Sequence, residues 1–304
     1  MGAGWVAGSV RAASLARHRL GPDGARELAA AGSVGAARAR LNDSPYAQAI
    51  AGEGSVRGLQ RAIWNSVLWD LRVLAGWLPP PGVAIARAFA AFFEVQNFED
   101  LLAHPGGERV SPFELGGLAI AWPHAQEATS ASGVREQLRR SAWRDPGTSD
   151  PSGMLLGLRL EWARLLSRIE PAAAWGTGAA ALVVAGGLAD GEQPVDPDVL
   201  HRVFAFGPEA RNATTVPALF TALPESARWA LEGIEHSSEL WRAEAGWWRR
   251  VEHDGERLLR AARPGRAVVV GGLSVRMADA WRTAAAVEIA SRGGRGREVL
   301  DVAA

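Results

Sequence analysis

Apolar residues recur at helical spacing along most of the chain. Between Ser55 and Leu78 they fall three or four positions apart, at Ile63, Val67, Leu71, Leu74 and Leu78. We expect Pro79–Gly82 to end this helix, because proline lacks a backbone N–H and clashes with the preceding turn. A further helix is predicted from about Val83 to Ala103, closed by His104-Pro105-Gly106-Gly107.

Both ends of the chain also have helical patterns. The segment Val10–Leu41 is rich in Ala, Arg and Leu, and Pro22 with Asp23 indicates a turn and a new helix start within Leu20–Gly24. From Pro224 to Ala262 apolar residues recur every seven positions. This pattern predicts one long helix with a continuous apolar stripe that contains Ile234, Trp241, Trp248 and, after a skipped step at Gly255, Ala262.

The chain contains one strand-like piece, Ala267–Gly272, in front of a last helix that ends at Ser291–Gly294. Gly271-Gly272 lacks the G-x-G-x-x-G spacing and the second strand of a dinucleotide site, so we interpret it as a connection between helices. Loops are predicted at Arg144–Gly153 and Asp190–Pro197. Because no run of alternating strands appears, the predicted class is all-α.

Two segments bear on targeting. Ala172–Ala189 approaches the length of a membrane span but consists mostly of Ala and Gly, so a packed helix is the expectation. The first twenty residues carry no charged region followed by a long apolar core, which argues against a secretory signal and favours a first amphipathic helix.

The composition excludes several kinds of chemistry. The chain has 304 residues, with 33 basic residues against 33 acidic ones, and it contains no lysine and no cysteine. Neutral charge argues against a nucleic-acid partner. The missing side chains exclude P-loop and Schiff-base lysines, thiolate nucleophiles, disulfides and Cys-ligated metals. The six histidines have no ligand spacing, so we expect no metal and no cofactor, and we assign the 13 tryptophans to core and protein contacts.

Two polar pairs interrupt apolar stretches. Glu94 and Asn97 lie one helical turn apart, as do Asp279 and Arg282, so each pair forms a polar spot on one helix face. A catalytic interpretation needs a second group and a pocket. A structural interpretation needs only a neighbouring helix end or loop to bond, and we favour it because buried polar groups generally find such partners.

An internal repeat accompanies these pairs. Arg38, Leu41, Ser44 and Tyr46 match Arg135, Leu138, Ser141 and Trp143 at constant spacing. Arg72–Pro79 matches Arg164–Pro171 further on, and Glu94/Asn97 matches Asp279/Arg282. Together the matches indicate about three helical units of similar length.

The N-terminal segment Ser9–Ile50 resembles the opening of the C-type central-stalk family of V-type and A-type rotary ATPases, whose eukaryotic relative is the d-type protein. The matching residues are Arg11, Leu20, Leu41, Ser44 and Tyr46. A second signature of that family, an aromatic, an acid and Asn one turn on, is matched by Phe93, Glu94, Asn97, Leu101 and Leu102. The family usually has Asp where this chain has Glu94.

The C-terminal segments "LWRAEAGWWRRVEHD" and "ADAWRTAAAVEIASRGG" are similar to those of actinobacterial-type members of the family. The resemblance covers both ends of the chain, whereas about 106–217 matches poorly. It implies a funnel of three similar helical lobes with approximate threefold pseudo-symmetry. We expect the lobes at residues 1–106, 107–217 and 218–304, with the N-terminal helix packing against the C-terminal lobe.

The resemblance also implies a function. Members are non-catalytic central-stalk adaptors that couple the D/F-type shaft subunits to the membrane proteolipid c-ring. They transmit torque between the ring, where protons or sodium ions are transported, and the part of the complex that synthesises or hydrolyses ATP. We therefore expect a peripheral protein on the cytoplasmic face of the plasma membrane that meets the membrane only through the ring. On this interpretation Tyr46, Glu94, Asn97, Asp279 and Arg282 form a structural motif, with no catalytic residue.

Two other classes of protein remain open. The first is an all-α enzyme or ligand-binding protein that uses Glu94, Asp279 and the Gly271-Gly272 segment. The second is a helical-repeat scaffold with unrelated partners. Convergence of the two acids in a pocket would favour the first, and the identity of the partners separates the second from a rotor component.

Overall fold

The computed structural model describes residues 2–103, 111–189, 206–261 and 263–303. This part of the chain contains α-helices and short 3-10 helices and no strand, which confirms the all-α class. The chain divides into two compact units. Unit 1 comprises Met1–Ala86 with Trp248–Ala304, and unit 2 comprises Arg87–Trp247. The division into three lobes stays a prediction.

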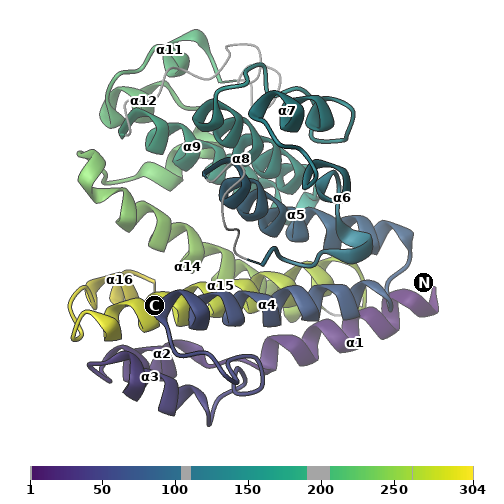
Figure 1. Cartoon of the computed structure of the whole chain (residues 1–304), viewed down its shortest axis with the longest axis vertical. Coiled ribbons are helices and arrows are strands. Elements are labelled where there is room, and N and C mark those ends of the chain that lie inside the picture. The colour runs from purple at the N-terminus through teal and green to yellow at the C-terminus, as the bar shows by residue number, and fades with distance from the viewer. Residues whose placement is uncertain (1, 104–110, 190–205, 262, 304) are drawn as a thin grey trace. The chain divides into compact units, whose positions relative to one another are not determined.

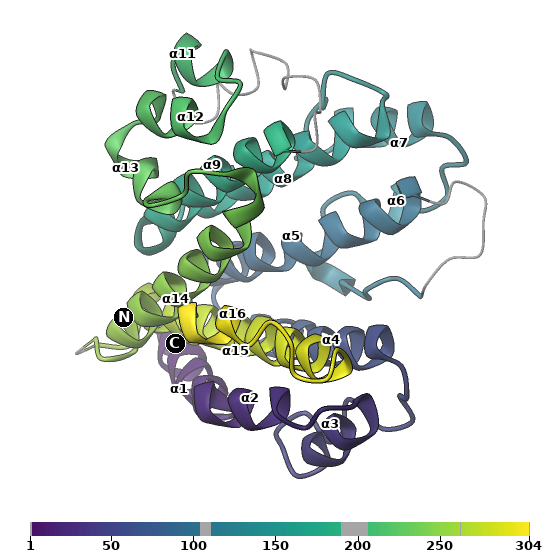
Figure 2. The same ribbon diagram turned by 90° about the vertical axis from the view of Figure 1, so that its left-hand side faces the viewer.

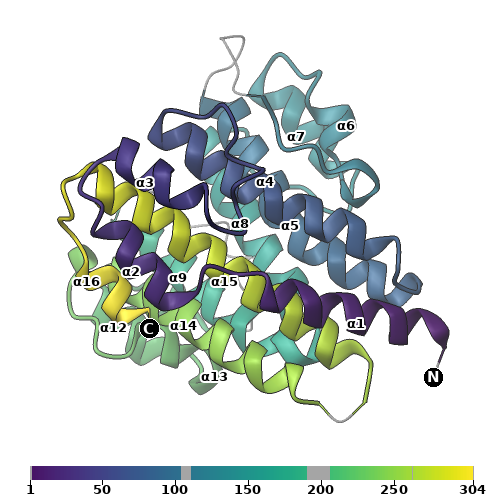
Figure 3. The ribbon, with the colours of Figure 1, turned by 90° about the horizontal axis from the view of Figure 1, so that it is seen from below.

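Unit 1 joins the two ends of the chain around one central helix. α15 lies between α1 and α4, and α2 packs along it as well (Figures 1 and 3). The helices of this unit are α1 (Ala3–Arg17), α2 (Gly21–Ala29), α3 (Val34–Leu41), α4 (Val56–Ala75), α15 (Arg266–Ser291) and α16 (Glu298–Val302). The unit also contains the first turns of α5 (Pro80–Ala103) and the last turns of α14 (Leu240–Leu259).

The central helix is buried on every side. From Val268 to Ala290 nearly every side chain of α15 is enclosed, including the polar residues Arg276, Asp279 and Arg282. A helix that is apolar all round belongs in a core, and polar groups persist there only where they find partners. The polar residues of α15 therefore mark its specific contacts with the helices around it.

Gly271 and Gly272 lie inside α15, so the strand-like interpretation of Ala267–Gly272 and the interpretation of the glycine pair as a connection are both wrong. A Cβ atom at position 271 would lie 2.5 Å from the carbonyl oxygen of Gly255 in α14, and one at 272 would lie 2.5 Å from that of Ala12 in α1. The glycines thus permit two helices to approach α15 backbone to backbone. A short apolar run cannot be told from a buried helix by pattern alone, which explains the error.

Unit 2 is built around a hairpin of two long helices, α8 and α9, which lie side by side (Figure 2). The last turns of α5 and the first turns of α14 also belong to it. Its other elements are 3-10 helices at Gly116–Leu118, Glu170–Ala172, Trp229–Leu231 and Ser237–Glu239, and the helices α6 (Trp122–Ala125), α7 (Ala131–Arg139), α8 (Pro151–Ser167), α9 (Ala173–Ala189), α11 (Pro208–Arg211), α12 (Val216–Ala222) and α13 (Glu225–Arg228).

Side-chain caps and prolines set the helix starts. The hydroxyl oxygen of Ser55 accepts the N–H of Gly58 at 3.0 Å and so begins α4, and the carboxylate of Asp150 accepts the N–H of Gly153 at 2.8 Å at the start of α8. Pro79–Gly82 was expected to end the preceding helix. Instead α4 ends at Ala75, and Pro80 is the first residue of α5, because the missing N–H of proline is harmless in a first turn.

The long helix predicted from Pro224 to Ala262 is interrupted, so that prediction is wrong. Gly233 adopts a φ of 74°, a left-handed conformation that ends regular helix. His236 and Glu239 then form a capping box in front of α14, which begins at Leu240. Ile234 therefore lies outside the helix, Trp248 is a buried residue within it, and Ala262 lies outside the described residues.

One described helical segment, Glu170–Leu188, is long and apolar enough to cross a membrane by length and composition, with a mean hydropathy of 1.3. Half of it is buried within the protein. It packs closely on α8, since a Cβ atom at Gly176 would lie 2.5 Å from the carbonyl oxygen of Ala163. The loop predicted at Asp190–Pro197 and the helix end at His104 lie outside the described residues.

Candidate functional site

The first candidate acid, Asp279, lies in the middle of α15 and is completely buried. Its carboxylate accepts the backbone N–H of Leu20 at 3.0 Å and that of Gly21 at 2.8 Å, at the point where α2 begins. These N–H groups have no partner inside their own helix, and the helix dipole favours a negative charge there. Asp279 therefore fixes the start of α2 to the central helix.

Tyr46 completes the surroundings of Asp279. Its hydroxyl donates to the carboxylate at 2.7 Å, and the same hydroxyl oxygen accepts an N–H from the guanidinium of Arg276 at 2.6 Å. The guanidinium also lies over the tyrosine ring, 4.6 Å from its centre. Tyr46 thus binds two charged side chains of α15 from the segment that follows α3.

Arg276 distributes its remaining donors to α4. Its Nε donates to Asp70 at 2.8 Å and its Nη2 donates to the hydroxyl of Ser66 at 3.0 Å. Burial alone would lower the pKa of Arg276, but the electrostatic effects of Tyr46, Asp70 and Asp279 outweigh it and raise that pKa above its ordinary value. Arg276 is 2% exposed, and the carboxylates of Asp70 and Asp279 compensate its charge.

The same environment acts on Tyr46. Burial raises the pKa of its phenol well above the ordinary value of 10.0, and the negative charge of Asp279 raises it further, against a smaller opposing effect of Arg276. The hydroxyl therefore keeps its proton and serves as a hydrogen-bond donor to Asp279.

The second candidate acid, Glu94, makes the equivalent contact in unit 2. Its carboxylate accepts the N–H groups of Ile120 at 2.7 Å, Ala121 at 2.5 Å and Trp122 at 2.7 Å, where α6 begins. Asn97, one turn further along α5, donates to the carbonyl of Phe113 at 3.0 Å and accepts its N–H at 2.7 Å. Both side chains are buried, and together they hold Phe113 and residues 120–122 against α5.

Arg282 differs from Asn97, although the sequence pattern paired them. It forms a bidentate ion pair with Glu252 of α14 and donates to the carbonyl of Ala303 at 3.1 Å. Glu252 also accepts from Arg19 at 3.2 Å. Arg282 therefore joins the C-terminal end of the chain and α14 to α15, whereas Asn97 binds the backbone of a loop.

The internal repeat corresponds to the same local structure in both units. After α3, the hydroxyl of Ser44 donates to the carbonyl of Leu41 at 2.7 Å and accepts the N–H of Tyr46 at 3.1 Å. After α7, the hydroxyl of Ser141 makes the matching contacts, with the carbonyl of Leu138 at 2.8 Å and the N–H of Trp143 at 3.1 Å. Each turn buries the aromatic residue that ends it.

Both candidate acids already accept hydrogen bonds from the protein. Asp279 belongs to unit 1 and Glu94 to unit 2, and each carboxylate accepts several hydrogen bonds from its own unit. A general base or nucleophile needs a free lone pair that faces a substrate. No group of three or more His, Asp or Glu side chains able to hold a metal ion occurs among the described residues.

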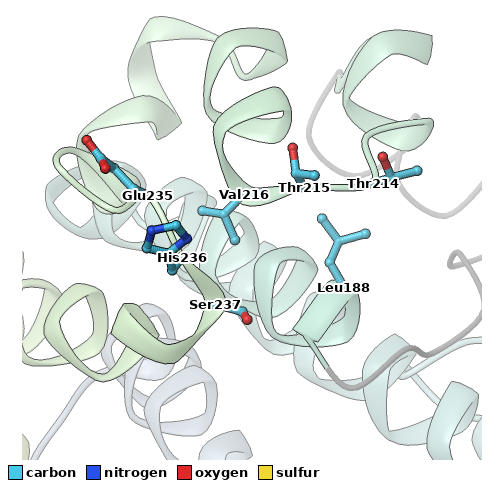
Figure 4. Close-up of a pocket in the computed structure, with 7 residues that line it drawn as sticks. All are labelled: Leu188, Thr214, Thr215, Val216, Glu235, His236 and Ser237. Carbon is cyan, nitrogen blue, oxygen red and sulfur yellow. The ribbon is translucent and has the colours of Figure 1, made fainter.

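An open pocket of about 250 Å³ lies in unit 2, between the end of α9, the start of α12 and the start of the 3-10 helix Ser237–Glu239 (Figure 4). Two of its polar side chains cap helix starts. The hydroxyl oxygen of Thr215 accepts the N–H of Ala218 at 3.3 Å, and a ring nitrogen of His236 accepts a backbone N–H of the Ser237–Glu239 helix. Neither Glu94 nor Asp279 lines it. The pocket therefore lies at a helix-capping region.

Sequence reasoning missed the centre of the unit 1 network. Arg276 and Asp70 were not candidates, although Arg276 is a charged residue within an otherwise apolar helix and lies three positions before Asp279. That placement was an available signal, because a charge on an all-round apolar helix needs a partner. Asp70 carries no such signal, since it lies at a partly exposed position of α4.

Comparison of the chain with models of known protein families gives no match, and comparison with curated proteins gives none either. A functional assignment consequently rests on the contacts described above and on the resemblance in the sequence.

Proposed function

We propose that this chain is a non-catalytic rotor adaptor of a V-type or A-type ATPase or ATP synthase. In this role it couples the central shaft subunits to the membrane proteolipid ring and transmits torque during proton or sodium transport. The residues that match the C-type central-stalk family, above all Tyr46, Glu94 and Asn97, support the proposal, because they are engaged in holding helices together.

The observation that carries the proposal is the repeated set of helices. In one set, α5 carries Glu94, which binds the start of α6, and α7, the Ser141 turn and α8 follow. In the other, α15 carries Asp279, which binds the start of α2, and α3, the Ser44 turn and α4 follow. The second set draws on both ends of the chain.

We infer a third set from α9, the short helices α11, α12 and α13, and α14. The hydroxyl of Thr177 in α9 donates to the carbonyl of Ser226 in α13 at 3.0 Å. The indole N–H of Trp247 in α14 donates to the carbonyl of Trp175 in α9 at 2.9 Å. α9 has no acidic residue, so this set lacks the carboxylate contact of the other two. Three such sets are what the predicted threefold pseudo-symmetry and funnel require.

A torque-transmitting part has to resist deformation, and the network around α15 supplies the kind of contacts that this needs. Asp279 accepts a charge-assisted hydrogen bond from α2 and Arg276 donates one to α4, and such bonds are stronger than neutral ones. Gly271 and Gly272 bring α14 and α1 into backbone contact with the same helix. We propose that these contacts make the repeats act as stiff bodies.

The test is native mass spectrometry of the tagged full-length protein, gently solubilised from the membranes of its own cells. The proposal predicts co-purification with a small, very apolar proteolipid and with a long coiled-coil shaft protein. Recovery as a soluble monomer or homodimer from cells that contain the ring would refute it. That result would favour an all-α enzyme or ligand-binding protein that uses Glu94 and Asp279.

A further inference from the structure

The large apolar side chains that stay exposed among the described residues all belong to unit 1. Among the described residues the large hydrophobic side chains that stay exposed are Val6 and Val10 of α1, at 45% and 64%, Trp69 of α4, at 62%, and Trp77 of the turn after α4, at 52%. The first half of α1 and the end of α4 lie at the same end of the unit (Figures 1 and 3).

Each exposed tryptophan has an arginine over its ring. The guanidinium carbon of Arg11 lies 5.7 Å from the ring centre of Trp77, and that of Arg72 lies 5.8 Å from the ring centre of Trp69. Such distances are typical of cation–π contacts. We call the six residues Val6, Val10, Arg11, Trp69, Arg72 and Trp77 the Trp–Arg surface.

This surface is positively charged, although the chain as a whole is neutral. Neither Arg11 nor Arg72 forms an ion pair with a carboxylate of the described residues, and α1 contains no acidic residue. Asp70, next to Trp69 in sequence, has its carboxylate engaged by Arg276 at 2.8 Å. An occupant of the surface should therefore be anionic as well as partly apolar.

We propose that the Trp–Arg surface binds the headgroup region of a membrane that contains anionic lipids. Tryptophan is favoured at the membrane interface because its ring is apolar and its N–H is polar, and arginine beside it pairs with lipid phosphates. A protein interface concentrates its anchors in one central pocket. Here the anchors are distributed over α1, α4 and the turn after α4, and each tryptophan has an arginine beside its ring. This arrangement suits a fluid membrane surface better.

This inference goes beyond the rotor role, in which the membrane is reached only through the ring. The lipid-binding proposal and the rotor proposal can also be tested separately. Loss of lipid binding would leave the co-purification with shaft and ring proteins unchanged, and absence of those proteins would leave lipid binding unchanged.

The test is sedimentation of the purified full-length chain with two kinds of vesicle, one of phosphatidylcholine alone and one of equal parts phosphatidylcholine and phosphatidylglycerol. We expect binding to the anionic vesicles only, and weaker binding as salt is added. The double variant Arg11→Gln with Arg72→Gln should lower the partition coefficient by about fivefold for each arginine, about 25-fold in all. Trp69→Ser with Trp77→Ser should lower it by about tenfold or more.

A matched control removes two arginines elsewhere. Arg139→Gln with Arg140→Gln lowers the net charge by the same amount at the end of α7 in unit 2, where both side chains are more than half exposed. This control should bind the anionic vesicles as the parent chain does. Circular dichroism should show parent-like thermal unfolding for the Arg11/Arg72 variant, because both side chains lie at the surface.

Three results would overturn the proposal. They are the absence of binding to anionic vesicles, equal binding to both kinds of vesicle, and an equal loss of binding in the Arg139/Arg140 control. Co-purification of an acidic protein that depends on Trp69 and Trp77, without vesicle binding, would assign the surface to a protein partner instead.

Discussion

Tyr46 makes the stability of this protein sensitive to alkaline pH in a way that can be isolated. It is the single tyrosine of a chain without lysine or cysteine. Between about pH 9 and pH 12 it is therefore the one side chain that titrates, because arginine stays protonated throughout this range. Its phenol is completely buried, and burial together with Asp279 raises its pKa well above 10.0.

The direction of the effect follows from proton linkage. In the unfolded chain the phenol loses its proton at about pH 10, whereas the folded protein keeps it to higher pH. The stabilisation is therefore fully present below about pH 10 and is lost as the pH rises toward the raised folded pKa. While the folded pKa stays above the pH, the free energy of unfolding should fall by about 1.4 kcal/mol at pH 11 and about 2.7 kcal/mol at pH 12.

The assay is urea unfolding at a series of pH values, together with the near-ultraviolet absorbance of tyrosinate. We expect the tyrosinate band of the native protein to appear only as the protein unfolds. Tyr46→Phe should remove the alkaline loss of stability. At neutral pH this variant should be about 1.5–3 kcal/mol less stable than the parent, since it loses one hydrogen bond to Asp279 and one from Arg276.

Trp143 provides the control, because it occupies the matching turn in unit 2 and does not titrate. Trp143→Phe should lower stability through lost packing and leave the alkaline slope unchanged. A tyrosinate band that appears near pH 10 while the protein is still folded would contradict the reasoning. So would an alkaline slope in Tyr46→Phe equal to that of the parent.

Further predictions concern the two carboxylates and the helix contacts. Asp279→Asn should lower the free energy of unfolding in urea by about 3–5 kcal/mol, because it also leaves the charge of Arg276 undercompensated. Glu94→Gln should lower it by about 2–4 kcal/mol, since its three N–H donors lose a charged acceptor, and an unchanged value for either variant would refute the helix-fixing role. Gly176→Ala should cost about 1–3 kcal/mol through its clash with α8. Gly186→Ala, on the same helix with open space around it, should instead stabilise the protein by about 0.5–1 kcal/mol in the same assay, and equal effects of the two would contradict the packing argument.

Several features of the fold followed from local pattern. The helical spacing from Ser55 onward predicted α4 within a few residues, and Pro22 with Asp23 marked the start of α2. The match of Leu41, Ser44 and Tyr46 with Leu138, Ser141 and Trp143 identified a turn that recurs in both units. These features depend on contacts between residues close in sequence, and such contacts leave a pattern that can be read without the fold.

Other features depended on contacts between distant parts of the chain. Asp279 and Glu94 stood out as acids in apolar stretches, but their partners, the N–H groups of Leu20 and of Ile120, have no side-chain signature. The helix predicted through Gly233 failed because a left-handed glycine is compatible with an uninterrupted apolar repeat in the sequence. The sequence pattern therefore identified the two acids, but it did not identify the backbone groups that they bind.

The sequence by itself determined that this protein is all-α, that its acids at 94 and 279 are special, and that lysine and cysteine chemistry is excluded. The tertiary structure decided that the two ends of the chain form one unit around α15, and that Arg276 connects Tyr46, Asp70 and Asp279 there. The physical reason is that side-chain spacing records which face of a helix is apolar. The partner of each buried charge, and the closeness that Gly271 and Gly272 allow, arise only when helices from distant parts of the chain pack together.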